Sequence, residues 1–141
     1  GLESTVIGWT GETPALLRPG AISREAIESM IGPLRKAGPE IQSPGQLQSH
    51  YAPSASLRLD ARDVRPGEEL LGFGDAPKSA LNLSPSGDLK EAAANLFAML
   101  HQLDKSGKGI AVMPIPESGL GEAINDRLRR AAAGRKKRPG K

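Results

Sequence analysis

The pattern of apolar and polar positions changes near residue 55 of this 141-residue chain. In the first part, β-prone segments on either side of a turn-forming Gly-Glu-Thr-Pro sequence predict a hairpin within residues 5–17. Ser23 is typical of a helix N-cap, and the helix that follows is expected to end before Gly32. A hairpin and a two-turn helix bury too little surface to be stable alone, so residues 1–31 are predicted to belong to a larger α/β domain.

The second part of the chain contains short apolar runs of the kind that form buried strands. Three of them predict strands at residues 57–59, 70–73 and 80–83. A continuous apolar run at residues 109–115 predicts a strand that is buried on both faces, which is typical of a parallel sheet. Because helical patterns separate the strands, residues 55–134 are predicted to form a small three-layer, Rossmann-like α/β domain with a mostly parallel sheet.

Two amphipathic helices are predicted in this second part. The first is expected to begin at the N-cap Asp88, with Glu91 as the reciprocal partner of a capping box, and to end at Gly107. The second is expected to run from its cap Ser118 through Ala133. The apolar residues at helical spacing, which should face the core, are Leu89, Ala92, Ala93, Leu96, Phe97, Leu100 and Leu103 in the first helix and Leu120, Ile124, Leu128 and Ala131 in the second.

Residues 32–54 carry four prolines and three glycines, which predict a linker rather than part of a core. Near the end of this segment, His50 stands beside Tyr51, the only tyrosine of the chain. A polar aromatic pair on a loop stiffened by proline is a candidate lid that contacts a ligand. An inert tether whose tyrosine packs on a neighbouring surface is the other interpretation.

The composition excludes several kinds of site. The chain has no cysteine, which excludes a disulfide framework and cysteine metal sites. Its two histidines, His50 and His101, are distant in sequence and lack acidic partners at metal-ligand spacing, so no bound metal is predicted. No apolar run approaches the roughly 18 residues of a membrane span, so no contact with a membrane is predicted.

The formal net charge of +3 hides an asymmetry along the chain. Residues 127–141 hold eight basic residues and no acidic one, so the preceding part of the chain is mildly acidic. Residues 135–141 are predicted to be a basic, disordered tail. This tail could contact nucleic acid nonspecifically or could simply be a solvated terminus, and the acidic body does not indicate a nucleic-acid surface.

The last predicted helix and the turn before it carry polar and glycine residues. Asn125, Asp126 and Arg127 are interpreted as residues that cap the helix and pair at its surface. The turn Gly119-Leu120-Gly121 has the free N–H groups of a phosphate-binding turn at a helix start. As a dinucleotide site it is weak, because the third glycine and the later acidic residue are missing.

Three segments, in order, are similar to one known family. They are Glu3-Ser4-Thr5-Val6-Ile7 with Leu17-Arg18-Pro19-Gly20-Ala21-Ile22, then Pro44-Gly45 with His50-Tyr51-Ala52-Pro53, then Gly119 through Leu128. This order resembles the two-domain L-threonylcarbamoyladenylate synthases, in which a linker joins a YrdC-type catalytic domain to a Rossmann-like domain. The resemblance implies a C-terminal fragment: residues 1–31 would end the catalytic domain, residues 32–54 would be the interdomain linker, and residues 55–134 would be the C-terminal domain.

The resemblance also implies a function. The synthases join threonine, bicarbonate and ATP, with Mg²⁺, into threonylcarbamoyl-AMP by nucleotidyl transfer, for tRNA modification in the cytoplasm, where other tRNA-modification proteins would be partners. Ser4 would contact threonine, Arg18 and Tyr51 would contact the nucleotide, and His50 is a further candidate for the lid. No catalytic residue is assigned, and the fragment alone is expected to be inactive. The other interpretation is a regulatory or nucleotide- or RNA-binding Rossmann-like module without catalysis of its own.

Overall fold

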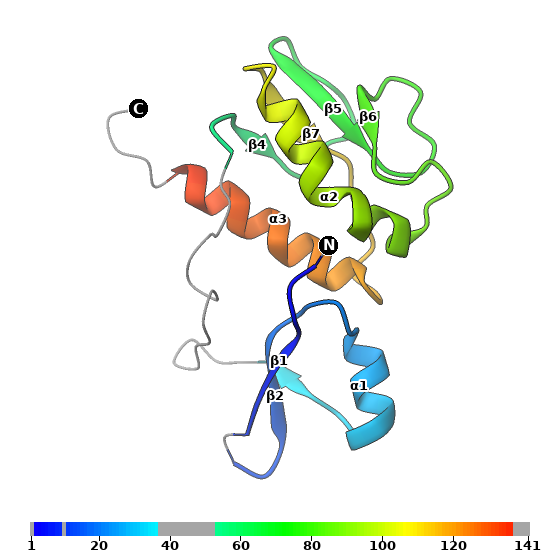
Figure 1. Cartoon of the computed structure of the whole chain (residues 1–141), viewed down its shortest axis with the longest axis vertical. Helices are drawn as coiled ribbons and strands as arrows, with labels where there is room; N and C mark the ends of the chain where they lie inside the picture. The colour runs from blue at the N-terminus through cyan, green and yellow to red at the C-terminus, as the bar shows by residue number, and fades with distance from the viewer. Residues whose placement is uncertain (1, 10, 37–52, 137–141) are drawn as a thin grey trace.

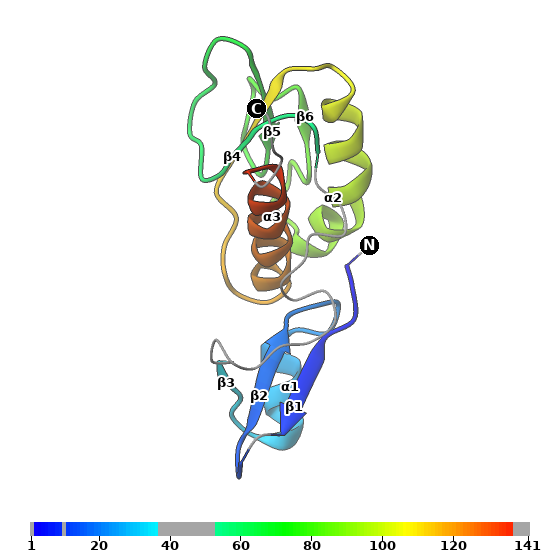
Figure 2. The ribbon, with the colours of Figure 1, turned by 90° about the vertical axis from the view of Figure 1, so that its left-hand side faces the viewer.

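Two sheets lie at opposite ends of the long axis of the molecule (Figures 1 and 2). The computed structural model describes residues 2–9, 11–36 and 53–136, with side chains described as far as Ala133. Residues 2–36 hold a three-stranded sheet and one helix, which we call the N-terminal lobe. Residues 53–136 hold a four-stranded sheet and two helices, which we call the C-terminal domain.

The N-terminal lobe contains the predicted hairpin. Strand β1 (Val6–Trp9) pairs antiparallel with β2 (Pro14–Arg18), with an irregular register between Val6 and Ile7. Helix α1 (Arg24–Ile31) follows, and the hydroxyl of Ser23 accepts a hydrogen bond from the amide of Ala26 at 3.1 Å. The predicted N-cap is therefore confirmed.

Helix α1 has no fully buried residue: Ile27 is half-buried, and its other apolar side chains are exposed. It ends at Gly32, whose φ of +94° is accessible to glycine at little cost. The amide of Gly32 donates to the carbonyl of Glu28 at 2.9 Å and closes the helix.

Residues 35–36 form a strand, although the sequence predicts a linker from residue 32 onward. Strand β3 (Arg35–Lys36) pairs in parallel with β2, so the N-terminal sheet has the order β1-β2-β3. The preceding Leu34 is buried, its amide donates to the carboxylate of Glu28 at 2.8 Å, and its carbonyl accepts from Arg24 at 3.0 Å. These contacts from α1 hold the segment against β2, and proline content alone does not reveal them.

The C-terminal domain is built on a parallel sheet, as the sequence predicts. Its strands β4 (Leu57–Arg58), β5 (Glu68–Gly72), β6 (Leu81–Asn82) and β7 (Gly109–Val112) lie in the order β4-β7-β5-β6, and every neighbouring pair is parallel. Helix α2 (Leu89–Asp104) connects β6 to β7, and α3 (Gly121–Lys136) follows β7. The predicted α/β class with a parallel sheet is confirmed.

The central strand β7 is buried on both faces, as expected. Ile110 and Val112 belong to the main core cluster, to which both α2 and α3 contribute. Ala111 faces the opposite side, where it packs with Ala61 and Leu70. Both helices therefore cover one face of the sheet, and the third layer is a loop rather than a helix. The amide of Ala61 in this loop donates to the carbonyl of Val112 at 2.8 Å.

Helix α2 buries the face that its periodicity predicts. Its buried residues are Ala92, Ala93, Leu96, Leu100 and Leu103, whereas Leu89 and Phe97 are partly buried. The predicted capping box is wrong in one respect. Asp88 does cap the helix, because its carboxylate accepts from the amide of Lys90 at 3.0 Å. However, Glu91 accepts from the hydroxyl of Ser84 at 2.5 Å, and the amide of Asp88 donates to that same hydroxyl at 2.8 Å.

Helix α3 begins and ends later than expected. It starts at Gly121 rather than near Ser118, because the carbonyl of Ser118 accepts from the amide of Gly121 in a preceding turn. A Cβ atom at Gly121 would lie only 1.7 Å from the carbonyl oxygen of Pro116, so this close approach requires glycine. The helix also continues past Gly134, since one glycine costs only about 0.5–1 kcal/mol in a helix interior.

We expect Ser84→Ala to lower the free energy of unfolding by about 1–3 kcal/mol. The substitution leaves the amide of Asp88 and the carboxylate of Glu91 without the buried hydroxyl that both contact. Urea unfolding followed by circular dichroism measures this change. The exposed Ser118→Ala, which removes a hydroxyl outside this network, is the control and should change stability little. Equal stabilities of the two variants would contradict the role given to Ser84.

Candidate functional site

Two of the predicted site residues, Ser4 and Arg18, lie in contact. The Nε and Nη2 atoms of Arg18 donate to the carbonyl oxygen of Ser4 at 3.1 and 3.0 Å. Arg18 is the last residue of β2, and Ser4 is exposed in the segment that leads into β1. The hairpin therefore places a serine hydroxyl and a guanidinium group on neighbouring segments, a pairing of groups that suits polar or anionic ligands.

A close crossing of two chain segments fixes this arrangement. The hydroxyl of Thr5 donates to the carbonyl of Ile22 at 2.7 Å and accepts from its amide at 3.1 Å. At Gly20, a Cβ atom would lie 2.3 Å from the carbonyl oxygen of Glu3 and 2.5 Å from the amide nitrogen of Thr5. Only glycine lets the segments pass at this distance, so Gly20 determines where Ser4 and Arg18 meet.

The first described residues reach across to the C-terminal domain. Leu2 packs against the main core cluster of that domain, and the carboxylate of Glu3 binds Arg130 of α3. Arg130 also donates to Asp126 at 2.9 Å, one turn earlier in the helix. Burial raises the pKa of Glu3, but the hydrogen bond and charge of Arg130, together with Arg18 and Arg127, outweigh burial and hold the pKa below its ordinary value of 4.5.

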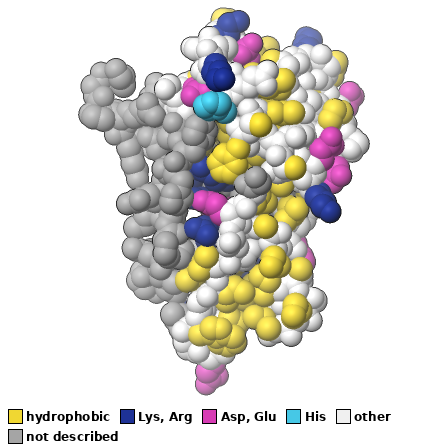
Figure 3. Space-filling model, viewed as in Figure 1, with side chains coloured by type: hydrophobic (Ala, Val, Ile, Leu, Met, Phe, Trp, Pro, Cys, Tyr) yellow, Lys and Arg dark blue, Asp and Glu magenta, His cyan; other side chains and the backbone are white. Residues whose placement is uncertain are grey.

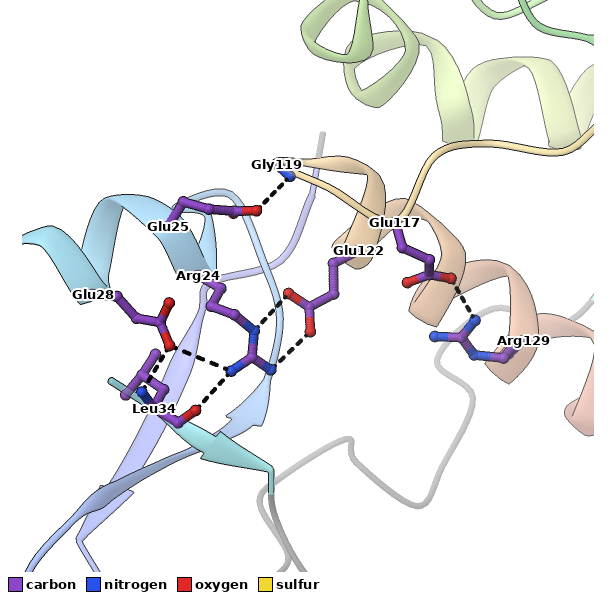
Figure 4. A network of polar contacts seen from close by, with 8 residues as sticks. All are labelled: Arg24, Glu25, Glu28, Leu34, Glu117, Gly119, Glu122 and Arg129. Atoms are coloured by element: carbon purple, nitrogen blue, oxygen red, sulfur yellow. Dashed lines mark hydrogen bonds and ion pairs between the residues drawn. The ribbon is translucent and has the colours of Figure 1, made fainter. Parts of the chain in front are cut away.

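Arg24 makes the central contact between the two parts of the molecule (Figure 4). Its Nε and Nη2 atoms donate to the two carboxylate oxygens of Glu122 in α3 at 3.2 and 2.9 Å. Both side chains are about one-fifth exposed, at 20% and 21%. The hydrogen bond from Arg24 to Glu122 raises the pKa of Arg24. A two-pronged pair of this kind is directional, so it sets the orientation of α1 relative to α3.

A second contact joins α1 to the turn before α3. The carboxylate of Glu25 accepts from the amide of Gly119 at 3.1 Å (Figure 4). This N–H belongs to the Gly119-Leu120-Gly121 turn, whose sequence is similar to that of a phosphate-binding turn. In the structure, one amide of that turn donates to a carboxylate of the N-terminal lobe. The hydrogen bond from Gly119 lowers the pKa of Glu25 below its ordinary value of 4.5.

A groove of about 650 Å³ lies between the two parts, and we call it the interlobe groove. It is lined by Arg24, Glu25, Leu34, Lys36, Glu117, Glu122 and Arg129, and an adjoining hollow adds Leu16, Leu17, Pro19 and Asp126. Basic and acidic side chains balance in the groove, and Arg129 donates to Glu117 at 3.1 Å (Figure 4). Such a balanced lining does not by itself favour a highly charged ligand.

Large apolar side chains are exposed on the N-terminal lobe. They are Trp9, Ile22, Met30 and Ile31, and Figure 3 shows hydrophobic side chains gathered over this end of the molecule. Met30 is 83% exposed, which is unusual for a methionine on an amphipathic helix.

Two expectations about site residues fall outside the part of the chain that the structure describes: His50 and Tyr51, and the basic tail from residue 137 onward. Within the described part, the polar cluster on α3 differs from the prediction. Arg127 is buried at 2% exposure, with its guanidinium carbon 4.8 Å from the centre of the Phe97 ring, rather than pairing at the surface. Asn125 donates to the carbonyl of Ile115 at 2.8 Å and fixes the loop after β7.

Sequence reasoning did not find the residues that join the two parts. Arg24 and Glu122 are 98 positions apart, and neither belongs to a recognisable pattern. Among the described residues, no group of three or more potential metal ligands comes together. In the same ranges, no helix has the length and apolar character that crossing a membrane requires.

The arrangement defines a Rossmann-like α/β domain with the N-terminal lobe joined to its last helix by polar contacts. A family model described as threonylcarbamoyl-AMP synthase, C-terminal domain, matches residues 22–133. The chain therefore belongs to this family.

Curated relatives and solved structures agree with that assignment. The threonylcarbamoyl-AMP synthase of Pyrococcus abyssi is 33% identical over 94% of this chain, and that of Bacillus subtilis is 31% identical over 96%. The crystal structure of P. abyssi Sua5 complexed with L-threonine superposes with a TM-score of 0.76 at 31% identity, over 96% of this chain and 47% of that one. The chain spans about half the length of the curated relatives, 46% in both cases.

We expect the contact between Glu25 and Gly119 to be lost on acidification. The pKa of Glu25 in the folded protein lies below its ordinary value of 4.5. The contribution of its hydrogen bond to stability is therefore fully present above pH 4.5 and is lost as the pH falls through the lowered pKa. The amide NMR signal of Gly119, followed from neutral pH downward, should shift with a midpoint below 4.5. Glu25→Gln should remove this inflection, and a midpoint above 4.5 would contradict the contact.

Proposed function

We propose that the chain is the C-terminal part of a threonylcarbamoyl-AMP synthase. In this proposal the complete enzyme joins threonine, bicarbonate and ATP, releases pyrophosphate and supplies threonylcarbamoyl-AMP for the modification of adenosine in tRNA. The observation that carries the proposal is the family match over residues 22–133, together with two relatives of that name that align with almost the whole chain. The cytoplasm, as the place of this reaction, and other tRNA-modification proteins as partners stay predictions.

Ser4 and Arg18 are proposed to contact substrates. The hydroxyl of Ser4 would bind threonine, and the guanidinium of Arg18 would bind phosphate oxygens of ATP. Their contact through the Ser4 carbonyl supports a shared role, because it brings the two groups to one place. The solved relative complexed with L-threonine gives threonine as a ligand of that protein. Mg²⁺ is proposed to accompany ATP in the complete enzyme, and we assign no ligand for it among the described residues.

His50 and Tyr51 are proposed to form a lid over the nucleotide. A second solved structure is that of a P. abyssi Sua5 variant in which a neighbouring histidine and tyrosine are replaced by alanine. His50-Tyr51 is the only such pair in this sequence. Tyr51 would exclude water from a labile carbamate intermediate, since water exclusion protects reactive intermediates in closed sites.

The C-terminal domain is proposed to regulate rather than to perform the reaction. Directional polar contacts from Arg24 and Glu25 to α3 and its preceding turn support this role, because they link the proposed substrate-binding lobe to a separate folded domain. A nucleotide- or RNA-binding module without any link to synthesis is the competing function, but the balanced charges of the interlobe groove do not favour it.

We expect the complete synthase that contains this chain to release pyrophosphate only when threonine, bicarbonate and ATP are all present. The chain alone should release none, because it aligns with only about half of each relative. Leaving out bicarbonate is the control for simple ATP hydrolysis. No product from the complete protein would contradict the proposed function, and product from this chain alone would contradict the division of roles.

Arg18→Ala in the complete synthase should weaken ATP binding by about 1.5–3 kcal/mol, because it removes a charge-assisted hydrogen bond to phosphate. Isothermal titration calorimetry measures the affinity, and circular dichroism checks folding. The matched control is Arg62→Ala, since Arg62 is exposed on a loop of the C-terminal domain. Unchanged ATP affinity in Arg18→Ala would contradict the assignment of Arg18 to the nucleotide.

A further inference from the structure

A cavity of about 170 Å³ lies at the carboxyl ends of the neighbouring parallel strands β4 and β7. Its lining consists of Leu59, Asp60, Val112, Met113, Glu117, Asn125, Leu128 and Arg129. In open parallel sheets, ligands bind in the crevice at the carboxyl ends of the strands. None of these residues belongs to the Ser4 and Arg18 pair, so the cavity is separate from the proposed substrate site.

The size of the cavity limits what it can hold. A cavity of about 150 Å³ accommodates a molecule the size of benzene. A volume of about 170 Å³ therefore suits a ligand with only a few more non-hydrogen atoms than benzene, which is smaller than a nucleotide. Four of the lining residues, Leu59, Val112, Met113 and Leu128, are apolar and offer a surface for a short aliphatic group.

The polar lining residues offer both signs of charge. Asp60 directly follows Leu59 at the end of β4 with a φ of +55°, a conformation that aspartate and asparagine adopt more readily than most residues. Among the described residues, its carboxylate forms no hydrogen bond or ion pair. Asn125 uses its amide nitrogen to bind Ile115, which leaves its side-chain oxygen as an acceptor.

Arg129 supplies the positive charge. Its Nη1 atom donates to Glu117 at 3.1 Å, and both side chains are more than half exposed, at 56% and 60%. Exposed ion pairs of this kind contribute little to stability. A ligand carboxylate in the cavity could therefore bind the guanidinium in competition with Glu117 at little cost.

We propose that this cavity binds a small free α-amino acid. The ammonium group would bind the Asp60 carboxylate and the Asn125 side-chain oxygen, the carboxylate would bind Arg129, and the side chain would pack on the apolar wall. A simple anion could bind Arg129 but would leave the Asp60 carboxylate unpaired, and a simple cation could bind Asp60 but would not use Arg129. A zwitterion satisfies both signs of charge.

The position of the cavity gives the site a regulatory use. Glu117 and Arg129 line both the cavity and the interlobe groove. An amino acid that draws Arg129 away from Glu117 changes the wall of the groove on the side of α3. The C-terminal domain would in this way sense an amino acid and adjust the contact with the N-terminal lobe.

The test uses the three methionines of the chain as reporters. Met113 lines the cavity, whereas Met30 lies on α1 and Met99 on α2, outside the cavity lining. With ¹³C-methyl-methionine labelling, L-alanine and L-threonine should shift the Met113 signal in a saturable way and leave Met30 and Met99 in place. Acetate and methylammonium, which each carry one half of the zwitterion, should shift Met113 far less at equal concentration.

Asp60→Asn and Arg129→Gln should each weaken L-alanine binding by at least about tenfold, because each removes a charge-assisted contact. Asparagine tolerates the left-handed conformation at position 60, so the first variant should fold. Arg62→Gln is the matched control for charge and should bind like the unaltered chain. Arg18→Gln should also leave the Met113 response intact, which separates this proposal from the proposed substrate site.

Three results would overturn the proposal: a Met113 signal that no amino acid moves, equal shifts with methylammonium or acetate alone, or unchanged affinity in both Asp60→Asn and Arg129→Gln.

Discussion

One guanidinium group links three separate segments where the two parts of this molecule meet. Arg24 sits at the start of α1, and its planar fork binds the Leu34 carbonyl on one side and both carboxylate oxygens of Glu122 on the other. Through these contacts it joins the first turn of α1, the segment before β3 and the first turn of α3. Removing one partner would leave the other partly buried charge without compensation, so such a pair is more costly to break than its net contribution to stability suggests.

The geometry of the neighbouring contacts follows from that constraint. With α1 held against α3, Glu25 comes within hydrogen-bond distance of the Gly119 amide, and the interlobe groove takes its shape. On the other side of the lobe, the Gly20 crossing holds Ser4 beside Arg18. The proposed substrate-binding residues are thus held together by close backbone approach. Charged contacts and the packing of Leu2 hold them relative to the C-terminal domain. These are different physical devices, and they respond differently to pH and salt.

The sequence predicts those features whose causes are local. Ser23 caps α1 because a hydroxyl and an amide three residues apart suffice, and the buried face of α2 follows from the helical period alone. The strand β3 was missed because contacts from α1, not residues 35–36 themselves, hold it in place. Glu91 meets Ser84 rather than Asp88 because the loop before α2 folds back on the helix start. In both of these differences from the prediction, a hydrogen bond between separate segments determines the local structure.

The same distinction applies to the candidate site. Ser4 and Arg18 are predicted as site residues from a resemblance in short motifs. In the structure, the guanidinium of Arg18 donates to the backbone carbonyl of Ser4. The contact between Arg24 and Glu122 and the burial of Arg127 depend on how helices and lobes pack, which no periodicity in a single sequence encodes. The sequence predicts surface pairing for Arg127, yet in the structure its planar group is buried against the ring of Phe97.

The contact of Leu2 with the C-terminal core has a consequence for how the two parts associate. The N-terminal lobe is joined to the C-terminal domain through the chain beyond Lys36 and is also held by its own first residues, Leu2 and Glu3. Two attachment points keep the groups that form each remaining contact at a high effective concentration. A contact that opens briefly therefore re-forms within the same molecule. Individually modest polar contacts can therefore keep the lobe docked most of the time and still let it release and rebind rapidly.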